Sequence, residues 1–289
     1  MKRGPNSFVT VRRAQTTFAH LRDGNDTALG THLIAAHQSV PLKPGNHDFD
    51  GTTVMLCALH EVREHVTGSL LDSPTVAEDT ELPTPQESFW AGDFGQQYTS
   101  RNQAPSMEDA NVWLFSRALR GAGPITSVME FGANSGLNLR ALRRIYSCLD
   151  CHAVEINPAA AELLAAEIGA ENTHLRSLFD YDPEGKSWDL VLCKGVLIHL
   201  APENLERAYE KIHLCARRYV LMMEYYSPDP VMVPYRGHQN RLFKRDYAGE
   251  FLDRYPDYSL LDYGFAYRRD PVAPQDDLTW FLMKRSHVG

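Results

Sequence analysis

The chain lacks the features that would give it a membrane or a nucleic acid as a partner. It has no run of about 18 or more apolar residues, the length that a membrane span requires. Residues 1–7 are followed by no long apolar core, so we expect no signal peptide. The net charge is −8, whereas sequence-independent binding of nucleic acid needs a basic face. The sequence therefore predicts a protein that binds neither.

Cysteine is also scarce, with five residues in a chain of 289. So few cysteines predict no disulfide framework, and we expect a reducing, cytoplasmic location. Cys148 and Cys151 form a C-x-x-C pair, but no other residues at zinc-ligand spacing stand near them. We expect these cysteines to be structural and the protein to hold no metal.

What the sequence does contain is a glycine turn between an apolar run and a helical pattern. Residues 125–131 predict a strand, and a helix is expected from Leu137. Between them, Gly132 and Gly136 allow a sharp turn and let a ligand lie against the backbone. Glu155 ends the next apolar run, 19 residues after Gly136. An acidic residue at that distance is placed to accept ribose hydroxyls, so the pattern predicts a nucleoside-containing cofactor.

The residues within this turn indicate which cofactor it binds. A dinucleotide fingerprint has three glycines, but Asn134 occupies the middle position and Glu130 stands two residues before Gly132. A carboxylate beside the ligand disfavours a pyrophosphate and favours a cation. S-adenosyl-L-methionine carries a sulfonium and an ammonium and no phosphate. The E-x-G-x-N-x-G pattern resembles motif I of class I S-adenosylmethionine-dependent methyltransferases; the alternative is a glycine turn without a ligand.

Strands and helices alternate along the rest of the chain, which predicts an α/β fold with a mainly parallel, doubly wound sheet. Two consecutive strands at the end are expected to pair antiparallel. This arrangement resembles the Rossmann-like class I methyltransferase fold, with seven strands and an antiparallel last strand. We expect strands at 125–131, 151–155, 174–177, 188–193, 218–224, 258–268 and 278–285, and helices at 106–119, 137–146, 158–168, 202–215 and 240–254.

Several longer segments resemble one family, the pseudaminic acid biosynthesis-associated methylases. The most specific are the Tyr-Arg-Gly-His block at 235–238 and the Gln-Asp-Asp-x-Thr-Trp block at 275–280. The resemblance implies the fold and the cofactor, and it implies the substrate only weakly. The other segments that carry it are 89–95, 98 with 101–102, 130–142, 194–199, 224–226, 233–234, 241–246, 274 and 281.

The resemblance and the strand-end positions together predict the cofactor site. Arg101 is expected to bind the cofactor carboxylate, because a guanidinium can hold it with two hydrogen bonds. Lys194 and Gly195 are expected beneath the transferred methyl group. Trp90, Tyr98 and Phe179 could instead be core residues. The full predicted set is Trp90, Tyr98, Arg101, Glu130, Gly132, Asn134, Gly136, Glu155, Ile156, Ser177, Leu178, Phe179, Lys194 and Gly195.

Catalytic and substrate-binding residues are predicted at the ends of the fourth, fifth and last strands. His199 and His238 are candidate general bases, because imidazole titrates near neutrality. His199 could instead only shape the pocket. Glu224 is the third catalytic candidate. Arg236 is expected to bind an acidic group, with Glu224 or Asp276 at the substrate's polar end. The predicted substrate-binding residues are Tyr225, Tyr226, Tyr235, Arg236, Lys244, Arg245, Gln275, Asp276, Asp277 and Trp280.

The amino-terminal part does not resemble the family before about residue 84. We expect a mainly helical extension at 1–71, a proline-containing linker at 72–86 and the methyltransferase domain at 87–289. The extension could be a lid, a degenerate domain or an arm that forms a homodimer.

Three functions are compatible with these patterns. The first is methylation, at oxygen or nitrogen, of a small acidic metabolite such as a nonulosonic sugar of the pseudaminic type or its nucleotide. The second is N-methylation of an amino acid or guanidino compound in a specialised biosynthesis. The third is a non-catalytic module that binds S-adenosylmethionine. A metal-dependent O-methyltransferase would need a cluster of hard oxygen ligands, which the sequence does not show.

Overall fold

The computed structural model describes residues 84–101 and 105–286 of the chain. The predicted extension at 1–71 and the linker as far as residue 83 lie outside these residues. Pro85 and Gln86, which we assigned to the linker, instead begin helix α1 (Pro85–Ala91). The reason is local: the Thr84 hydroxyl accepts the Glu87 N–H, and Pro85 has the φ of a first helical turn.

A seven-stranded sheet forms the centre of the described domain, in the order β3-β2-β1-β4-β5-β9-β8. Neighbours from β3 to β5 run parallel, and β9 pairs antiparallel with both β5 and β8. The predicted doubly wound sheet with an antiparallel last strand is therefore confirmed. The strands are β1 (Ser127–Phe131), β2 (Asp150–Glu155), β3 (Thr173–Leu175), β4 (Trp188–Lys194), β5 (Ala216–Glu224), β8 (Tyr258–Ala266) and β9 (Leu278–Arg285).

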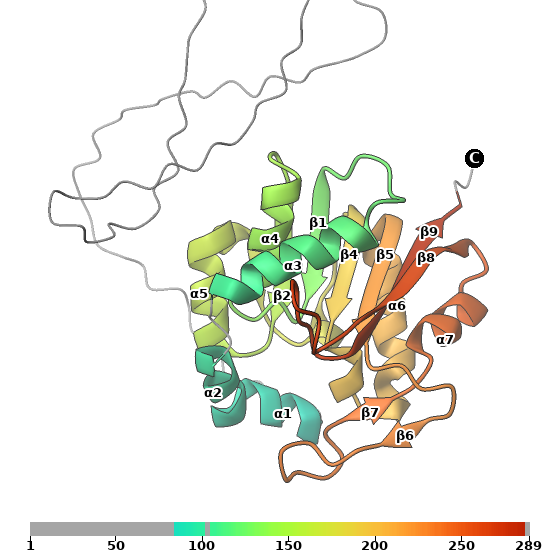
Figure 1. Ribbon diagram of the computed structural model, residues 1–289. Helices are drawn as coiled ribbons and strands as arrows, with labels where there is room; N and C mark the ends of the chain where they lie inside the picture. Colours follow the sequence, from blue (N-terminus) through green and yellow to red (C-terminus); the bar gives the residue numbers. More distant parts are fainter. Residues whose placement is uncertain (1–83, 102–104, 287–289) are drawn as a thin grey trace, which may run out of the picture. The chain divides into compact units, whose positions relative to one another are not determined.

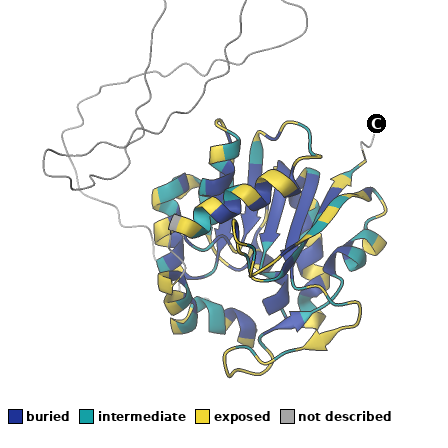
Figure 2. Cartoon of the chain, in the orientation of Figure 1, coloured by how far each residue is buried: buried dark blue, intermediate teal, exposed yellow. Residues whose placement is uncertain are grey.

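Helices cover both faces of this sheet (Figure 1). Apolar side chains of α3 (Pro105–Ala118), α4 (Leu137–Ile145) and α5 (Pro158–Ile168) form one buried cluster with the sheet. Those of α6 (Leu205–Cys215) and α7 (Tyr247–Arg254) form a second cluster on the other face. The central strands are therefore buried on both sides (Figure 2), which explains their nearly continuous apolar sequences. No helix in the described ranges has the length and apolarity needed to cross a membrane.

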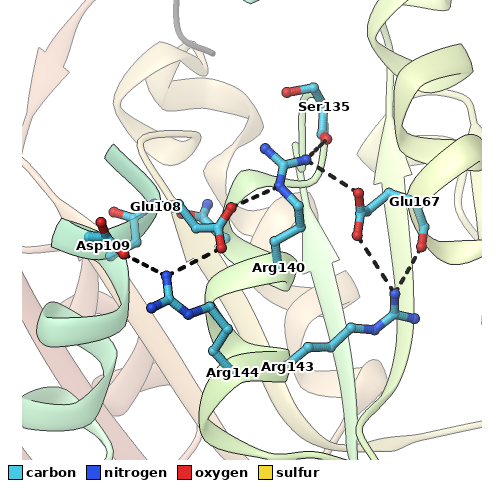
Figure 3. Close-up of polar contacts among 9 residues, drawn as sticks. Glu108, Asp109, Ser135, Arg140, Arg143, Arg144 and Glu167 are labelled. Atoms are coloured by element: carbon cyan, nitrogen blue, oxygen red, sulfur yellow. Dashed lines mark hydrogen bonds and ion pairs between the residues drawn. The ribbon is translucent and has the colours of Figure 1, made fainter. Parts of the chain in front are cut away.

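The outer side of α4 carries arginines that connect three helices (Figure 3). Arg140 pairs with Glu108 of α3 at 3.2 Å and with Glu167 of α5 at 3.5 Å. Arg140 also donates to the carbonyl oxygen of Ser135 at 3.1 Å, in the turn before α4. Isolated surface pairs contribute little stability, but this network is partly buried and linked at several points. It fixes the glycine turn relative to α3, α4 and α5.

The helix predicted at 240–254 is wrong in its first half. Residues Phe243–Lys244 form a short strand, β7, that pairs with β6 (Val231–Met232), and α7 begins only at Tyr247. The Asp246 carboxylate accepts the Gly249 N–H, so this residue caps the helix rather than continuing it. The positive φ of 55° at Asn240 also excludes a helix there. A helix α2 (Asp93–Arg101) follows α1 and was not predicted.

A glycine in the edge strand β8 offers a test of the packing between β8 and β9. A Cβ on Gly264 would stand 2.6 Å from the indole ring of Trp280, which is buried. We predict that Gly264→Ala lowers the free energy of unfolding by about 1–3 kcal/mol, because the ring must move. Gly121→Ala is the control, since its Cβ would meet only Leu261 at 3.7 Å. Urea unfolding of both variants measures this; equal losses would contradict the account.

Candidate functional site

A cavity of about 260 Å³ lies at the carboxyl ends of β1, β2 and β4. The arrowheads of β1 and β4 point toward the side of the sheet where α1 and α2 lie (Figure 1). Parallel strands place their ends together, which is why residues far apart in sequence meet here. The structure brings fourteen predicted residues to its wall: Trp90, Tyr98, Gly132, Asn134, Glu155, Ile156, Ser177, Leu178, Phe179, Lys194, Gly195, His199, Gln275 and Asp276.

The glycine turn forms one wall of the cavity. Gly132 has a φ of 69°, and a Cβ there would stand 2.6 Å from Val196, so only glycine fits. Asn134 also has a positive φ, of 50°, and its side-chain oxygen accepts the Ser135 N–H at 2.7 Å. Gly136, in contrast, does not line the cavity. It caps α4 with a φ of 81° and lies against Leu164, so its role is packing.

The carboxylate of Glu155 lies at the junction of the turn and α5. It accepts the N–H groups of Asn134 at 2.7 Å and Asn157 at 2.8 Å. Burial raises the pKa of this carboxyl, and the backbone N–H donors oppose that rise. Each carboxylate oxygen has a second lone pair, and Glu155 lines the cavity. Glu155 therefore fixes the turn and can still accept hydrogen bonds from a ligand.

The short helices α1 and α2 form the opposite wall, and side-chain amides hold them there. The Nδ2 group of Asn157 donates to the carbonyl oxygens of Trp90, Ala91 and Gly92 at 3.1, 3.1 and 3.2 Å. Its Oδ1 atom accepts the Ala160 N–H and so caps α5 at the same time. One side chain thus joins the end of α1 to the start of α5.

Two further contacts close this wall. The Asn134 amide donates to the Thr99 hydroxyl of α2 at 3.0 Å, and the Ser177 hydroxyl donates to Glu87 of α1. Where the two helices meet, a Cβ on Gly95 of α2 would stand 1.9 Å from the Trp90 carbonyl oxygen of α1, so this close approach requires glycine. The wall therefore bonds to the glycine turn and to the segment after β3.

A buried polar network occupies the inner end of the cavity. Asn111 of α3 accepts from Lys194 Nζ and from Gln275 Nε2, both at 3.0 Å. Its amide donates to Asn138 Oδ1 at 2.9 Å, and the Asn138 amide donates to Glu130 Oε1 at 2.6 Å. Burial lowers the pKa of Lys194 to about 8, and Glu130 and Asp276 favour its charged form. Glu130 does not line the cavity, and burial raises its pKa to about 7.

His199 follows β4 and faces the cavity beside aromatic rings. Its Nδ1 atom lies 2.6 Å from the Arg241 carbonyl oxygen, which can only accept, so Nδ1 carries the proton. Burial lowers the pKa of His199 to about 4, so the ring is neutral near pH 7. Its centroid is 4.6 Å from that of Trp90 and 4.9 Å from that of Tyr235. This tautomer leaves Nε2 as the ring's acceptor.

Glu224, predicted to be catalytic, is placed elsewhere. It is buried and does not line the cavity, and its carboxylate accepts the N–H groups of Val196, Leu197 and Ile198 at 3.1, 3.1 and 3.4 Å. The physical reason is that the chain turns sharply after β4 and leaves three donors that need an acceptor. Glu224 therefore fixes the backbone that carries His199.

The Tyr-Arg-Gly-His block is a tight turn rather than a wall of the cavity. Tyr235 and His238 exchange backbone hydrogen bonds, and Arg236 and Gly237 have φ values of 48° and 87°. Arg236 and His238 are exposed, and neither lines the cavity. Tyr235 packs against the Trp90, Phe94 and His199 rings. The predictions that Arg236 binds substrate and that His238 is a base are not supported by this placement.

Other predicted residues are engaged in contacts outside the cavity. Arg101 is exposed, with its guanidinium 5.9 Å from the Phe94 ring centroid. Arg245 pairs with Glu250 at 2.7 Å, and Trp280 is buried in the core. Asp277 pairs with Arg268, Lys244 lies over the half-buried Tyr225 ring, and Tyr226 is exposed near Phe281.

The structure also adds lining residues that the sequence patterns did not indicate. Asn111 and Met107 come from α3, for which the sequence predicted a helix at 106–119 but no site residue. Asn138 and Asn157 lie beside the predicted positions but were not singled out. The others include Gln86, Glu87, Arg176, Leu200 and Pro274. The described residues contain no group of three or more His, Cys, Asp or Glu side chains that could hold a metal ion.

Comparisons with known proteins agree with this geometry. Residues 129–218 match the family model described as a methyltransferase domain. No curated protein matches the chain. The 1,6-didemethyltoxoflavin-N1-methyltransferase of Burkholderia thailandensis is similar at 19% identity, with 73% of this chain and 94% of that chain covered and a TM-score of 0.53. Magnesium protoporphyrin IX methyltransferase of Synechocystis PCC 6803 is similar at 14% identity, with 72% and 100% covered and a TM-score of 0.50.

At these sequence identities the solved structures show the fold alone. The described part of the chain has the fold of class I methyltransferases, and residues 129–218 match a methyltransferase domain. The narrower resemblance to the pseudaminic acid-associated family stays a prediction.

The double role of Asn157 can be separated by substitution. Asn157→Asp keeps an acceptor for the Ala160 N–H but replaces the amide donor with a carboxylate that repels three carbonyl oxygens. We predict faster hydrogen exchange in α1 and about ten-fold weaker binding of S-adenosylmethionine, which is ~1.4 kcal/mol. Mass-detected hydrogen exchange and calorimetry measure the two effects.

The matched control is Asn172→Asp. Asn172 also donates its side-chain amide to a carbonyl oxygen, that of Ile168, but at the other end of α5. This variant should leave both readouts unchanged. If both variants weakened binding equally, the anchoring role of Asn157 would be wrong.

The buried Glu224 should make stability depend on pH. Burial raises its pKa to about 8, against the lowering by three backbone N–H groups. Between pH 6 and 8 the folded state then binds a proton that the unfolded state has released, so the free energy of unfolding falls as pH rises. Glu224→Gln removes this dependence. We predict that the free energy of unfolding of wild type, minus that of Glu224→Gln, falls by about 1–2 kcal/mol from pH 6 to pH 8.

Urea unfolding at pH 6, 7 and 8 measures the difference between wild type and variant. Glu210→Gln, a change at an exposed position on α6, is the control and should give a constant difference. A constant difference for Glu224→Gln as well would show that the carboxylate is ionised throughout this range.

Proposed function

We propose that this methyltransferase acts on a small, polar, acidic metabolite, at oxygen or nitrogen. A nonulosonic sugar of the pseudaminic type, or its nucleotide, is the kind of substrate that the sequence resemblance favours. The observation that carries the proposal is the inner end of the cavity. There the ammonium of the half-buried Lys194 lies near the Asp276 carboxylate and two side-chain amides, next to the glycine turn.

The residues that line the cavity suit S-adenosyl-L-methionine, which we propose as the methyl donor. Gly195 has a φ of 68°, and a Cβ there would meet no atom within 4 Å, so the backbone is open to a ligand. Glu155 is the proposed acceptor for the ribose hydroxyls, and buried Leu178 and Phe179 offer an apolar surface for the adenine. When bound, S-adenosylmethionine supplies the methyl group and carries away the electron pair on sulfur.

The remaining lining groups are proposed to orient the substrate. Methyl transfer is an in-line displacement, so the main task is to position the nucleophile. Lys194 would bind an acidic group, and Asp276 would accept from hydroxyl or amino groups. His199 has a neutral ring with Nε2 as its acceptor, so it can take a proton if the nucleophile must lose one.

A second candidate is N-methylation of an amino acid or guanidino compound. It is favoured by the presence of Asp276 and Glu87 in the same cavity, because carboxylates can bind an ammonium or guanidinium. The two candidates share the cofactor site and differ in which end of the substrate lies at Lys194.

The test uses the full chain and S-adenosylmethionine labelled in its methyl group. One pool of acceptors contains nonulosonic acids, free and nucleotide-activated; the other contains amino and guanidino acids. We expect label in the first pool. Label only in the second pool would establish the alternative, and label in neither would contradict both.

The cofactor assignment has its own test. We predict that Glu155→Gln weakens binding of S-adenosylhomocysteine about ten-fold or more, which is ~1.4 kcal/mol, because it removes a charged acceptor and disturbs the turn. Glu162→Gln, at an exposed position on α5, makes the same charge change and should have no effect. Calorimetry compares the two. Unchanged affinity in Glu155→Gln would remove Glu155 from the cofactor site.

A further inference from the structure

The unusual group in the cavity is a lysine at the end of a buried strand. Lys194 is the half-buried last residue of β4, whose other residues are buried, and its ammonium donates only to neutral oxygens. These are Asn111 Oδ1 at 3.0 Å and Asn138 Oδ1 at 3.5 Å. Among the described residues, no carboxylate oxygen lies within 4.0 Å of Nζ. A charge withdrawn from water is costly unless it is paired; Glu130 and Asp276 favour the charged form of Lys194, but neither forms an ion pair with it.

We infer that the inner end of the cavity is a carboxylate-binding subsite, in which Lys194 is the ion partner and Asn111 is a positioning residue. This inference rests on the proposed function, since it names what a ligand of that site must carry.

Asn111 controls where the ammonium lies. Its side chain is 2% exposed, and its Oδ1 atom accepts from Lys194 and Gln275 together. Its amide group donates to Asn138, so all three contacts agree on one orientation of the amide. Helix α3, helix α4, strand β4 and the segment before β9 each contribute one member of this network. An ammonium has three N–H groups, and two of them are directed to Asn111 and Asn138.

The distribution of cations around the cavity favours this position for an acid. The other lysine or arginine on its wall is Arg176, which is exposed and adjoins Ser177 and the apolar surface of Leu178 and Phe179. Arg101, the cation predicted for a carboxylate, does not line the cavity. One buried ammonium matches one monoanion, so a carboxylate suits the subsite better than a phosphate dianion.

Two ligands could supply the carboxylate: the methionine tail of the cofactor or the substrate. The experiment therefore uses two matched pairs of probes. S-adenosylhomocysteine has the tail carboxylate, and 5′-methylthioadenosine lacks it. N-acetylneuraminate, added with saturating S-adenosylhomocysteine, is compared with its neutral methyl ester. Calorimetry gives the dissociation constant of each probe for wild type and Lys194→Met, which keeps the length of the side chain.

We expect the preference for the acid in one pair to fall about ten-fold or more in Lys194→Met, while the neutral probe of that pair binds as before. If the preference for the acid falls in the pair of S-adenosylhomocysteine and 5′-methylthioadenosine, the subsite binds the cofactor. If it falls in the pair of N-acetylneuraminate and its methyl ester, the subsite binds the substrate. Unchanged preference in both pairs would overturn the inference. If wild type itself failed to bind S-adenosylhomocysteine, the proposed function would fail instead.

Two variants keep the test specific. Arg101→Met removes a cation outside the cavity and should leave both preferences intact; if it alone reduced them, the inference would be wrong. Asn111→Asp keeps an acceptor for Lys194 but adds an internal carboxylate, which should pair with the ammonium and reduce the same preference. Retained binding of 5′-methylthioadenosine shows that each variant is folded. A purely structural role for Asn111 would weaken both probes of a pair equally.

Discussion

The side-chain amide of Asn157 is the contact on which the cavity depends. The sheet alone would offer only a row of strand ends, because β1, β2 and β4 contribute backbone and a few side chains to one side. The opposite wall consists of two short helices, α1 with seven residues and α2 with nine, too short to be stable in isolation. Three carbonyl oxygens at the end of α1 share the Asn157 amide, and this hydrogen bonding gives the wall its position.

Carboxylates at three strand ends have a common physical role. Glu130, Glu155 and Glu224 end or nearly end β1, β2 and β5, and each is buried. Glu155 accepts backbone N–H groups from the turns that follow β1 and β2, and Glu224 accepts them from the turn that follows β4. Glu130 accepts from the Asn138 side chain. Donors left over where the chain turns are thereby satisfied inside the protein. The loops around the cavity are consequently fixed before any ligand arrives, which lowers the entropy cost of binding.

Most of the fold could be predicted from the sequence because buried parallel strands have continuous apolar runs. The predicted helix at 158–168 and strand at 278–285 have the observed bounds. The helix predicted from residue 240 failed at its start, since helical periodicity does not reveal that Asp246 acts as a cap. The wall of the cavity that the glycine turn forms could be predicted from the spacing of the glycines.

The second wall and the inner end of the cavity could not be predicted, because the bonds of Asn157 to α1 and of Asn111 to Lys194 and Gln275 join residues 65 or more positions apart. Nothing local marks an asparagine as such an anchor. The position of Arg236 could not be predicted for a related reason. A basic residue among aromatics resembles a pocket wall, but a positive φ places Arg236 in an exposed turn outside the cavity.

Helix α1 is held from both sides. Its end is bonded to Asn157, and two of its side chains contact another segment. The Gln86 amide donates to the Asn240 carbonyl oxygen at 3.2 Å, and the Phe89 ring packs against the His238 ring with 4.9 Å between centroids. The segment between β6 and β7 is therefore attached to the same short helix that encloses the cavity. A displacement of α1 away from the cavity would break its hydrogen bonds to Asn157, and it would carry this segment along as long as the Gln86 and Phe89 contacts hold.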